Sequence, residues 1–152
     1  MIPQALPFVT GAPAPPALNR EQWLTYVAVL LRPWFSRHGF EIPLRVRLGV
    51  GALALTTRTL GVCYPQVDRA GFRHVTISPF IDDPLLVAAV LAHELIHAGL
   101  PPNEGHGPHF RRVARRVGFE GRLTEVRPGP ALRAEIAAVV RRAGAYPHVA
   151  LT

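Results

Sequence analysis

One stretch decides how this chain folds: Pro84-Leu85-Leu86-Val87-Ala88-Ala89-Val90-Leu91-Ala92-His93-Glu94-Leu95-Ile96-His97. Its first part is apolar at every position after the proline, which indicates a helix that is buried nearly all round. Asp82, shortly before it, is typical of a helix N-cap, and Pro84 suits the first turn. We therefore predict a buried central helix that ends in two histidines and a glutamate.

The spacing of those polar residues predicts a metal site. Residues four apart lie on the same helical face, so His93 and His97 can reach one ion. Glu94 projects beside them, where its carboxylate can take a proton from a water that the metal activates. A bound ion also gives buried polar groups a partner, which they need. We predict one catalytic Zn2+; the alternative is a helix whose core histidines are satisfied by hydrogen bonds.

A catalytic zinc takes a third protein ligand and keeps one position open for water. Gly99, Pro101 and Pro102 are expected to end the helix. The HExxHxxGxxH pattern is absent, because Leu100 stands at its glycine and Asn103 at its last histidine. The residues alone leave four candidates for the third ligand: His106, His109, Glu104 and Glu120.

The segments His93-Glu94-Leu95-Ile96-His97-Ala98 and Gly105-His106-Gly107-Pro108-His109-Phe110 together resemble the SprT-like (Spartan-type) zinc metallopeptidases. The resemblance covers roughly residues 19–119, and includes weaker matches at 58–63 and 75–79. It implies that His106 is the third ligand and that the fold is zincin-like. It also implies a protease that cuts proteins associated with DNA. The loop of eight residues from Ala98 to Gly105 is short for that family.

His109 departs from the family, which usually has glutamate at this position. Spaced three residues from His106, it could face the metal as an alternative ligand. It could instead line the cleft as a proton donor or substrate contact, or be an ordinary half-exposed histidine. A tetrahedral oxyanion also needs a stabilising group, for which the sequence offers several candidates: Tyr64, His74, His109 and nearby arginines.

The composition favours a single domain with an acidic partner. The chain has 152 residues and a net charge of +7, and all 17 of its Lys and Arg residues are arginine. A basic surface attracts nucleic acid above all, although a coding bias towards G and C would also enrich arginine. The expected location is cytoplasmic, because no signal peptide is visible and the apolar run at 85–92 is too short to cross a membrane.

Cys63 is the only cysteine. It excludes a disulfide within the chain and fits a reducing compartment. One cysteine also cannot form the zinc ribbon that many SprT-like proteins carry, so we expect none here. We expect Cys63 to be a small buried strand residue rather than a nucleophile.

The chain divides into a Pro-rich flexible arm at 1–18 and a domain at 19–152. Asn19 and Gln22 predict a capping box at the start of a helix. Pro33 is expected to end or kink that helix, with a second piece reaching His38.

Alternation predicts a strand at 44–48. Further strands are predicted at 53–58, after the glycines Gly49 and Gly51, and at 61–66 and 73–78, where the turn at 68–71 makes the last two a hairpin. The resemblance places 73–78 beside the cleft, where a peptide could add to its edge. Further helices are predicted at 107–117 and 130–142, with a short extended piece at 123–126. The helix at 107–117 has one basic face, which is either a phosphate contact or a solvated face: Arg111, Arg112, Arg115 and Arg116.

These patterns together predict an α+β zincin-like domain with an N-terminal helix, a short mixed sheet, the metal-binding helix and C-terminal helices. The predicted function is a zinc metalloprotease, a hydrolase of peptide bonds, acting on a protein or peptide substrate with DNA as a possible partner. Two alternatives stay open. One is a DNA-binding module whose histidines close a structural zinc site. The other is a regulatory peptidase of the ImmA type, whose third ligand is acidic. Neither the substrate nor the oligomeric state is predicted.

Overall fold

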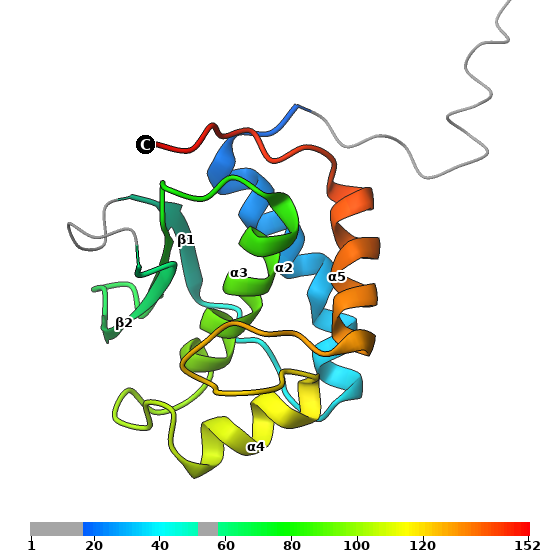
Figure 1. Ribbon diagram of the computed structural model, residues 1–152. Coiled ribbons are helices and arrows are strands. Elements are labelled where there is room, and N and C mark those ends of the chain that lie inside the picture. The colour runs from blue at the N-terminus through cyan, green and yellow to red at the C-terminus, as the bar shows by residue number, and fades with distance from the viewer. Residues whose placement is uncertain (1–16, 52–57) are drawn as a thin grey trace, which may run out of the picture.

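A computed structural model describes residues 17–51 and 58–152. Within these residues the chain forms an α+β fold with a three-stranded sheet (Figure 1). The elements follow in the order α2 (Arg20–Arg37), β1 (Val46–Val50), β2 (Gly61–Val67), β3 (Arg73–Ile77), α3 (Pro84–Ala98), α4 (Pro108–Val117) and α5 (Pro130–Ala143). The predicted arm, apart from its last two residues, and the strand expected at 53–58, apart from Arg58, lie outside the described residues.

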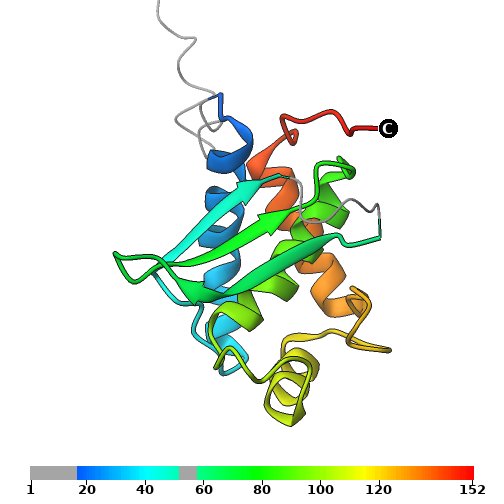
Figure 2. The same ribbon diagram turned by 90° about the vertical axis from the view of Figure 1, so that its left-hand side faces the viewer.

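The sheet is mixed, as predicted, and its strand order is β1-β3-β2. β1 runs parallel to β3, and β2 runs antiparallel to it, so Val75 lies opposite both Leu48 and Cys63. The helices cover one face of this sheet (Figure 2). The hairpin is confirmed, but the placement of 73–78 at an open edge is wrong, because β3 is paired on both sides. Among the described strands, β1 forms one edge of the sheet and β2 forms the other.

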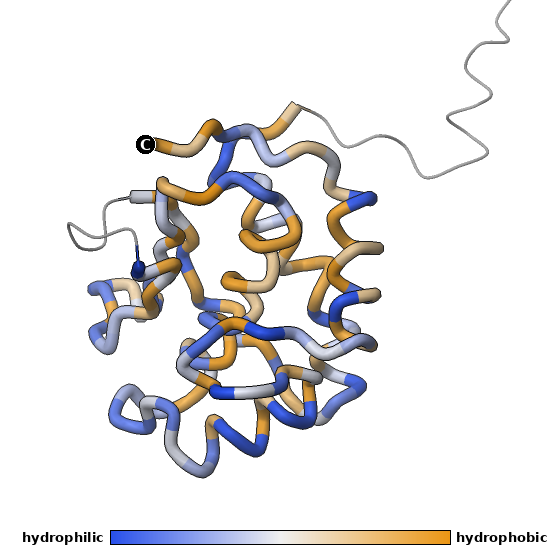
Figure 3. Tube along the Cα trace, in the orientation of Figure 1, coloured by the Kyte–Doolittle hydropathy of each residue, from blue (hydrophilic) through white to orange (hydrophobic). Residues whose placement is uncertain are grey.

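α3 runs through the middle of the molecule, between the sheet and α5 (Figure 1). Eleven of its 15 residues are buried, which is the expected result of a sequence that is apolar all round. Figure 3 shows that α3 is apolar along most of its length. Asp83, rather than the expected Asp82, is the N-cap and accepts from the backbone N–H of Leu85. Asp82 is engaged elsewhere: its carboxylate accepts from the N–H of Ala150 near the C-terminus.

α2 begins with the predicted capping box between Asn19 and Gln22. It does not end at Pro33, which lies inside the helix. Pro33 is exposed, so the carbonyl group of Val29 that loses its helical partner is on the solvent side, where water can satisfy it. The buried face of α2 supplies much of the core, and Trp23 donates from its indole to the carbonyl of Gly144 beyond α5.

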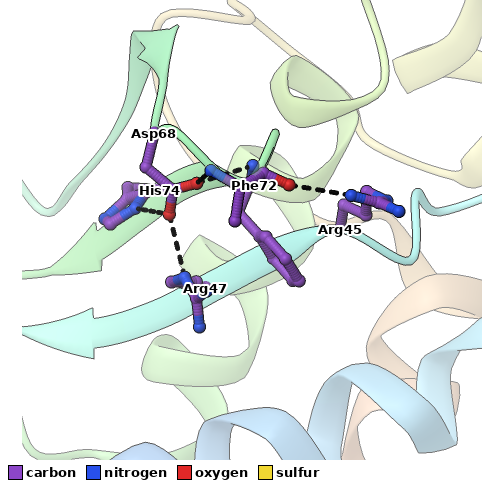
Figure 4. A network of polar contacts seen from close by, with 6 residues as sticks. Arg45, Arg47, Asp68, Phe72 and His74 are labelled. Atoms are coloured by element: carbon purple, nitrogen blue, oxygen red, sulfur yellow. Dashed lines mark hydrogen bonds and ion pairs between the residues drawn. The ribbon is translucent and has the colours of Figure 1, made fainter.

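The turn between β2 and β3 is held by Asp68 (Figure 4). Its carboxylate accepts from the N–H groups of Ala70 and Phe72 and contacts Arg47 and His74, both at 2.9 Å. These hydrogen bonds, that of His74 foremost, hold the pKa of Asp68 well below its usual range. The predicted turn at 68–71 is thus confirmed. The His74 ring contacts Asp68 in this turn.

The C-terminal half places α4 and α5 around the end of α3. α4 buries an apolar stripe that includes Phe110 and Val117 and exposes its arginines, as predicted. α5 packs against α2 and α3. The connection between α4 and α5 crosses the C-terminal end of α3 (Figure 1). It contains a turn at 123–124 instead of the expected extended piece, because the chain must reverse for Phe119 to pair with Pro128.

No helix in residues 17–51 and 58–152 has the length and apolar character needed to cross a membrane.

Candidate metal centre

Three histidine side chains converge at the C-terminal end of α3. His93 and His97 come from successive turns of that helix, and His106 comes from the loop that follows it. The Nε2 atom of His106 lies 3.3 Å from Nε2 of His93 and 3.2 Å from Nε2 of His97. The ligand atoms of the three side chains all lie within 4.8 Å of one another. They are therefore close enough to bind one metal ion.

These distances are compatible with three ligands of one metal ion. Two ligands at a tetrahedral ion with bonds of about 2.0–2.1 Å are separated by about 3.3–3.4 Å, which is close to both observed distances. Burial is the main cause that lowers the pKa of His93 to about 3 and that of His97 to about 4. Both imidazoles are therefore neutral near pH 7, with a lone pair available for a metal.

The loop between α3 and α4 brings His106 to the helix. It turns at Gly105, which has a φ of 55°, and Gly107 donates to the carbonyl of Glu104. The carboxylate of Glu104 accepts from the backbone N–H groups of His109 and Phe110, and so caps α4 from the loop. This satisfies N–H groups that the start of α4 would otherwise leave without partners. Glu104 is thus a capping residue.

Phenylalanine side chains fix the orientation of the imidazole rings. Phe110 stacks on His97 with ring centroids 4.2 Å apart, and its ring lies 5.1 Å from that of His93. Phe119 meets His93 edge-on at 5.9 Å. Phe110 and Phe119 are both fully or almost fully buried. The rings therefore have little freedom to turn away from the point where their Nε2 atoms meet.

Glu94 lies next to the cluster and is buried. Burial is the largest influence on its carboxyl group and raises the pKa to about 7, while a hydrogen bond from the backbone of Cys63 acts in the opposite direction. Among the described residues, no arginine or histidine forms an ion pair with it. The carboxyl group can therefore hold or release a proton near neutral pH.

A cavity of about 610 Å³ opens onto these residues. It lies between the β2 edge, at Leu60–Cys63, and the loop before α5. Sequence reasoning did not find the contribution of that loop, because Thr124, Glu125 and Val126 have no motif and come from a distant segment. Arg58 also belongs to the lining.

Tyr64 and Cys63, which adjoin on β2, differ in their relation to this cavity. Cys63 lines the cavity, whereas Tyr64 is 38% exposed and is not part of the lining. Arg73 contacts the Cys63 thiol at 3.2 Å, and it also donates to the carbonyl of Tyr64. Burial nevertheless raises the pKa of Cys63 to about 11, so the group is a thiol at neutral pH. Cys63 is in β2, as expected, but it is only partly buried, and a protonated thiol is a weak nucleophile.

The other candidate ligands lie apart from the cluster. His109 is exposed in the first turn of α4, and Glu120 is exposed in the loop after it. In the part of the chain that the structure describes, the group able to share an ion consists of His93, His97 and His106. The second ring nitrogen of His93, Nδ1, is buried and has no hydrogen-bond partner among the described residues.

The arginines of α4 form a surface of their own. All four are exposed, and with Pro108 they line a hollow of about 650 Å³. The four residues are Arg111, Arg112, Arg115 and Arg116.

No protein-family model, curated protein or solved structure matches this chain. The functional interpretation therefore rests on the fold and the site. Together they define an α+β protein with a three-histidine candidate metal centre, a neighbouring buried glutamate and an open cavity.

Proposed function

We propose that this protein is a zinc-dependent endopeptidase of the SprT-like type, with a zincin-like fold. His93, His97 and His106 would hold the metal, and Glu94 would act as the general base. One observation carries the proposal: three Nε2 atoms converge beside a buried carboxyl group, on the wall of a cavity. A structural site would need no proton acceptor and no open space next to its ligands.

The donor set favours zinc. Neutral imidazole nitrogens suit zinc, copper, iron and nickel, while calcium and magnesium prefer oxygen. Three protein ligands with an open position are the usual arrangement of a catalytic zinc site. When bound, zinc makes a water molecule more acidic and polarises a carbonyl group.

Glu94 moves the proton in this proposal. Its carboxylate accepts a proton when water adds to the peptide carbonyl and later gives it to the leaving amine. The apolar surroundings of Glu94 stabilise the protonated form between these two steps. His93 and His97 would remain neutral throughout and would hold the metal together with His106.

The edge of β2 offers a place for the substrate. Residues Gly61, Val62 and Cys63 line the cavity, and among the described strands β2 pairs with β3 alone. An extended peptide can add to such an edge by main-chain hydrogen bonds. Its scissile bond would then face the histidine cluster across the cavity. Arg58 lies in the same lining and is our candidate for stabilising the oxyanion.

Two alternative functions have less support. A closed structural zinc site would need a fourth ligand, and His109 is exposed outside the cluster. An acidic third ligand of the ImmA type would come from Glu104 or Glu120, but Glu104 caps α4. Nucleic acid remains a proposed partner, for which the exposed arginines of α4 provide a basic surface.

The decisive experiment compares the zinc-loaded protein with Glu94→Gln on an unfolded protein substrate. We expect the variant to keep one zinc per chain and the same far-UV circular dichroism, and to lose at least about 100-fold in cleavage rate, as when a general base is removed. Glu135→Gln on α5 removes the same charge away from the cavity and should cleave normally. Equal cleavage by the wild type and Glu94→Gln would refute the proposal.

A further inference from the structure

A second hollow adjoins the candidate metal centre on the side of α4. It has a volume of about 450 Å³ and shares two lining residues, His106 and Thr124, with the cavity next to Glu94. The other residues of its wall come from α4 and from the loop that follows: Arg111, Arg115, Gly121, Arg122 and Leu123. The hollow and the cavity therefore border each other at His106 and Thr124.

The wall of this hollow is positively charged. It contains three arginines and no carboxylate side chain. All ten Asp and Glu residues of the chain are among the described residues, and none of them forms an ion pair with Arg111, Arg115 or Arg122. The nearby Glu125 pairs with Arg127 at 3.1 Å instead. The positive charge of the hollow is therefore not neutralised within the chain.

Arg115 is held in place at this hollow. Its two terminal nitrogens donate to the carbonyls of Phe119, at 3.3 Å, and Gly121, at 2.8 Å. Neutral carbonyls orient the guanidinium but do not cancel its charge. Arg111 and Arg122 are exposed and line the same hollow. A fixed guanidinium that shares the wall of a hollow with two other arginines is suited to a carboxylate, which accepts paired N–H groups.

We propose that this hollow is a specificity subsite for an acidic side chain of the peptide substrate. The inference rests on the proposed peptidase function and names the class of substrate that this function would take. An extended peptide advances about 3.3 Å per residue, and the hollow is lined by His106, which belongs to the candidate metal centre. The acidic residue would therefore lie within about two positions of the scissile bond.

A peptide fits the observations better than a nucleic acid does. The hollow shares His106 and Thr124 with the cavity that Glu94 lines, so a peptide bound in that cavity lies beside the hollow. A phosphate backbone makes many successive contacts along a continuous basic surface, such as the four arginines of α4, and two of these arginines, Arg111 and Arg115, also line the hollow. The two ligands make different predictions, and one set of variants separates them.

The test uses the full zinc-loaded chain and three matched peptides that differ at one position near the cleaved bond, with Glu, Gln or Lys. We expect the wild type to cleave the Glu peptide about tenfold faster than the Gln peptide, as kcat/KM, and the Lys peptide most slowly. In the double variant Arg111→Gln/Arg122→Gln, the kcat/KM for the Glu peptide divided by that for the Gln peptide should fall towards one. Arg115 is kept, because it also holds the loop.

Arg141→Gln/Arg142→Gln is the matched control. It removes two exposed arginines from α5, far from the hollow in sequence, and changes the net charge equally. We expect it to retain the full preference for the Glu peptide. Loss of the preference in this control would assign the effect to overall charge and overturn the subsite.

A binding measurement makes the subsite testable even without cleavage. The affinities of the Glu and Gln peptides for zinc-loaded Glu94→Gln should differ by about tenfold, and this difference should vanish when Arg111 and Arg122 are also replaced. Absence of any cleavage with this binding difference present would refute the peptidase function alone. Equal affinity for both peptides would refute the subsite alone. If only a single-stranded oligonucleotide loses affinity in Arg111→Gln/Arg122→Gln, the hollow is a nucleic-acid contact and the subsite is wrong.

Discussion

Gly61 lies directly against Glu94, and its lack of a side chain is what allows β2 to approach α3 so closely. A Cβ atom at residue 61 would be 3.1 Å from Cγ of Glu94 and 2.7 Å from Cγ1 of Val90. Real Cβ atoms essentially never come as close as the second distance. The position of the proposed general base thus depends on a glycine of the neighbouring strand.

Gly61→Ala should therefore disturb both stability and activity. We expect a loss of about 1–3 kcal/mol in the free energy of unfolding, because the added methyl group overpacks a buried helix–strand contact. Cleavage should fall because Glu94 is displaced, while zinc binding should persist. Urea denaturation and a cleavage assay measure the two effects.

Gly49→Ala is the control for this substitution. Gly49 is in β1, and a Cβ there would meet no atom within 4 Å. We expect a change in stability within about 0.5 kcal/mol and normal cleavage. If Gly61→Ala behaved like Gly49→Ala, the close contact with Glu94 would be wrong.

Removal of His106 should affect zinc binding much more than removal of His109. His106→Ala takes away one of three converging nitrogens, so we expect zinc affinity to fall more than about 100-fold, beyond the usual effect of losing a hydrogen-bond partner of a ligand. His109→Ala removes an exposed ring outside the cluster and should change the affinity less than about threefold. Competition with a coloured chelator measures both values. Similar losses in the two variants would make His109 a ligand.

The sequence predicted the part of the site that depends on local spacing. His93, Glu94 and His97 share one helix, so the helical repeat alone brings them together. His106 required the resemblance, because a loop of this kind has no repeat that fixes where its histidine points. The structure shows what fixes it: the Glu104 cap and the packing of Phe110.

Other features were beyond sequence reasoning because they depend on tertiary contacts. The position of β3 in the centre of the sheet follows from how strands pair, and the alternation of 73–78 is the same for an edge or a central strand. The continuation of α2 through Pro33 depends on which side of the helix faces water. The loop at 124–126 reaches the cavity through chain reversal, with no pattern that marks it as part of a site.

Glu104→Gln should lower stability and zinc affinity because it loosens the loop between α3 and α4 that holds His106. The carboxylate accepts from two backbone N–H groups at the start of α4, at 2.9 and 3.4 Å, and an amide is a weaker acceptor than a carboxylate at this position. We expect a loss of about 0.5–1.5 kcal/mol in stability and a modest fall in zinc affinity as His106 becomes less well held. Hydrogen exchange at residues 104–110 should rise. Zinc affinity lowered as strongly as in His106→Ala would instead assign Glu104 to the metal.

The stability of the metal-free protein should fall when the pH is lowered from 7 to 5. The pKa of His93 is about 3 and that of His97 about 4 in the folded protein, against an ordinary value of 6.5. Over this range the unfolded chain takes up protons at these histidines and the folded protein does not, so acid favours unfolding. Glu94 acts in the opposite direction: its folded pKa of about 7 exceeds the ordinary 4.5, so the folded protein binds the extra proton. Between pH 7 and 5 the unfolded chain takes up more extra protons at the two histidines than the folded protein takes up at Glu94. The net effect of acid is therefore a lower free energy of unfolding.

Glu94→Gln provides the test of this sign. The variant removes the opposing contribution, so its stability should fall more steeply than that of the wild type between pH 7 and 5. Urea midpoints measured with a chelator present, at pH 7, 6 and 5, give the two slopes. Asp68, whose folded pKa is lowered below an ordinary 3.8, loses its contribution only below this range and does not interfere. A slope in Glu94→Gln that equals that of the wild type, or is shallower, would show that folded Glu94 takes up no extra proton in this range, and its proposed role in holding a proton would then be wrong.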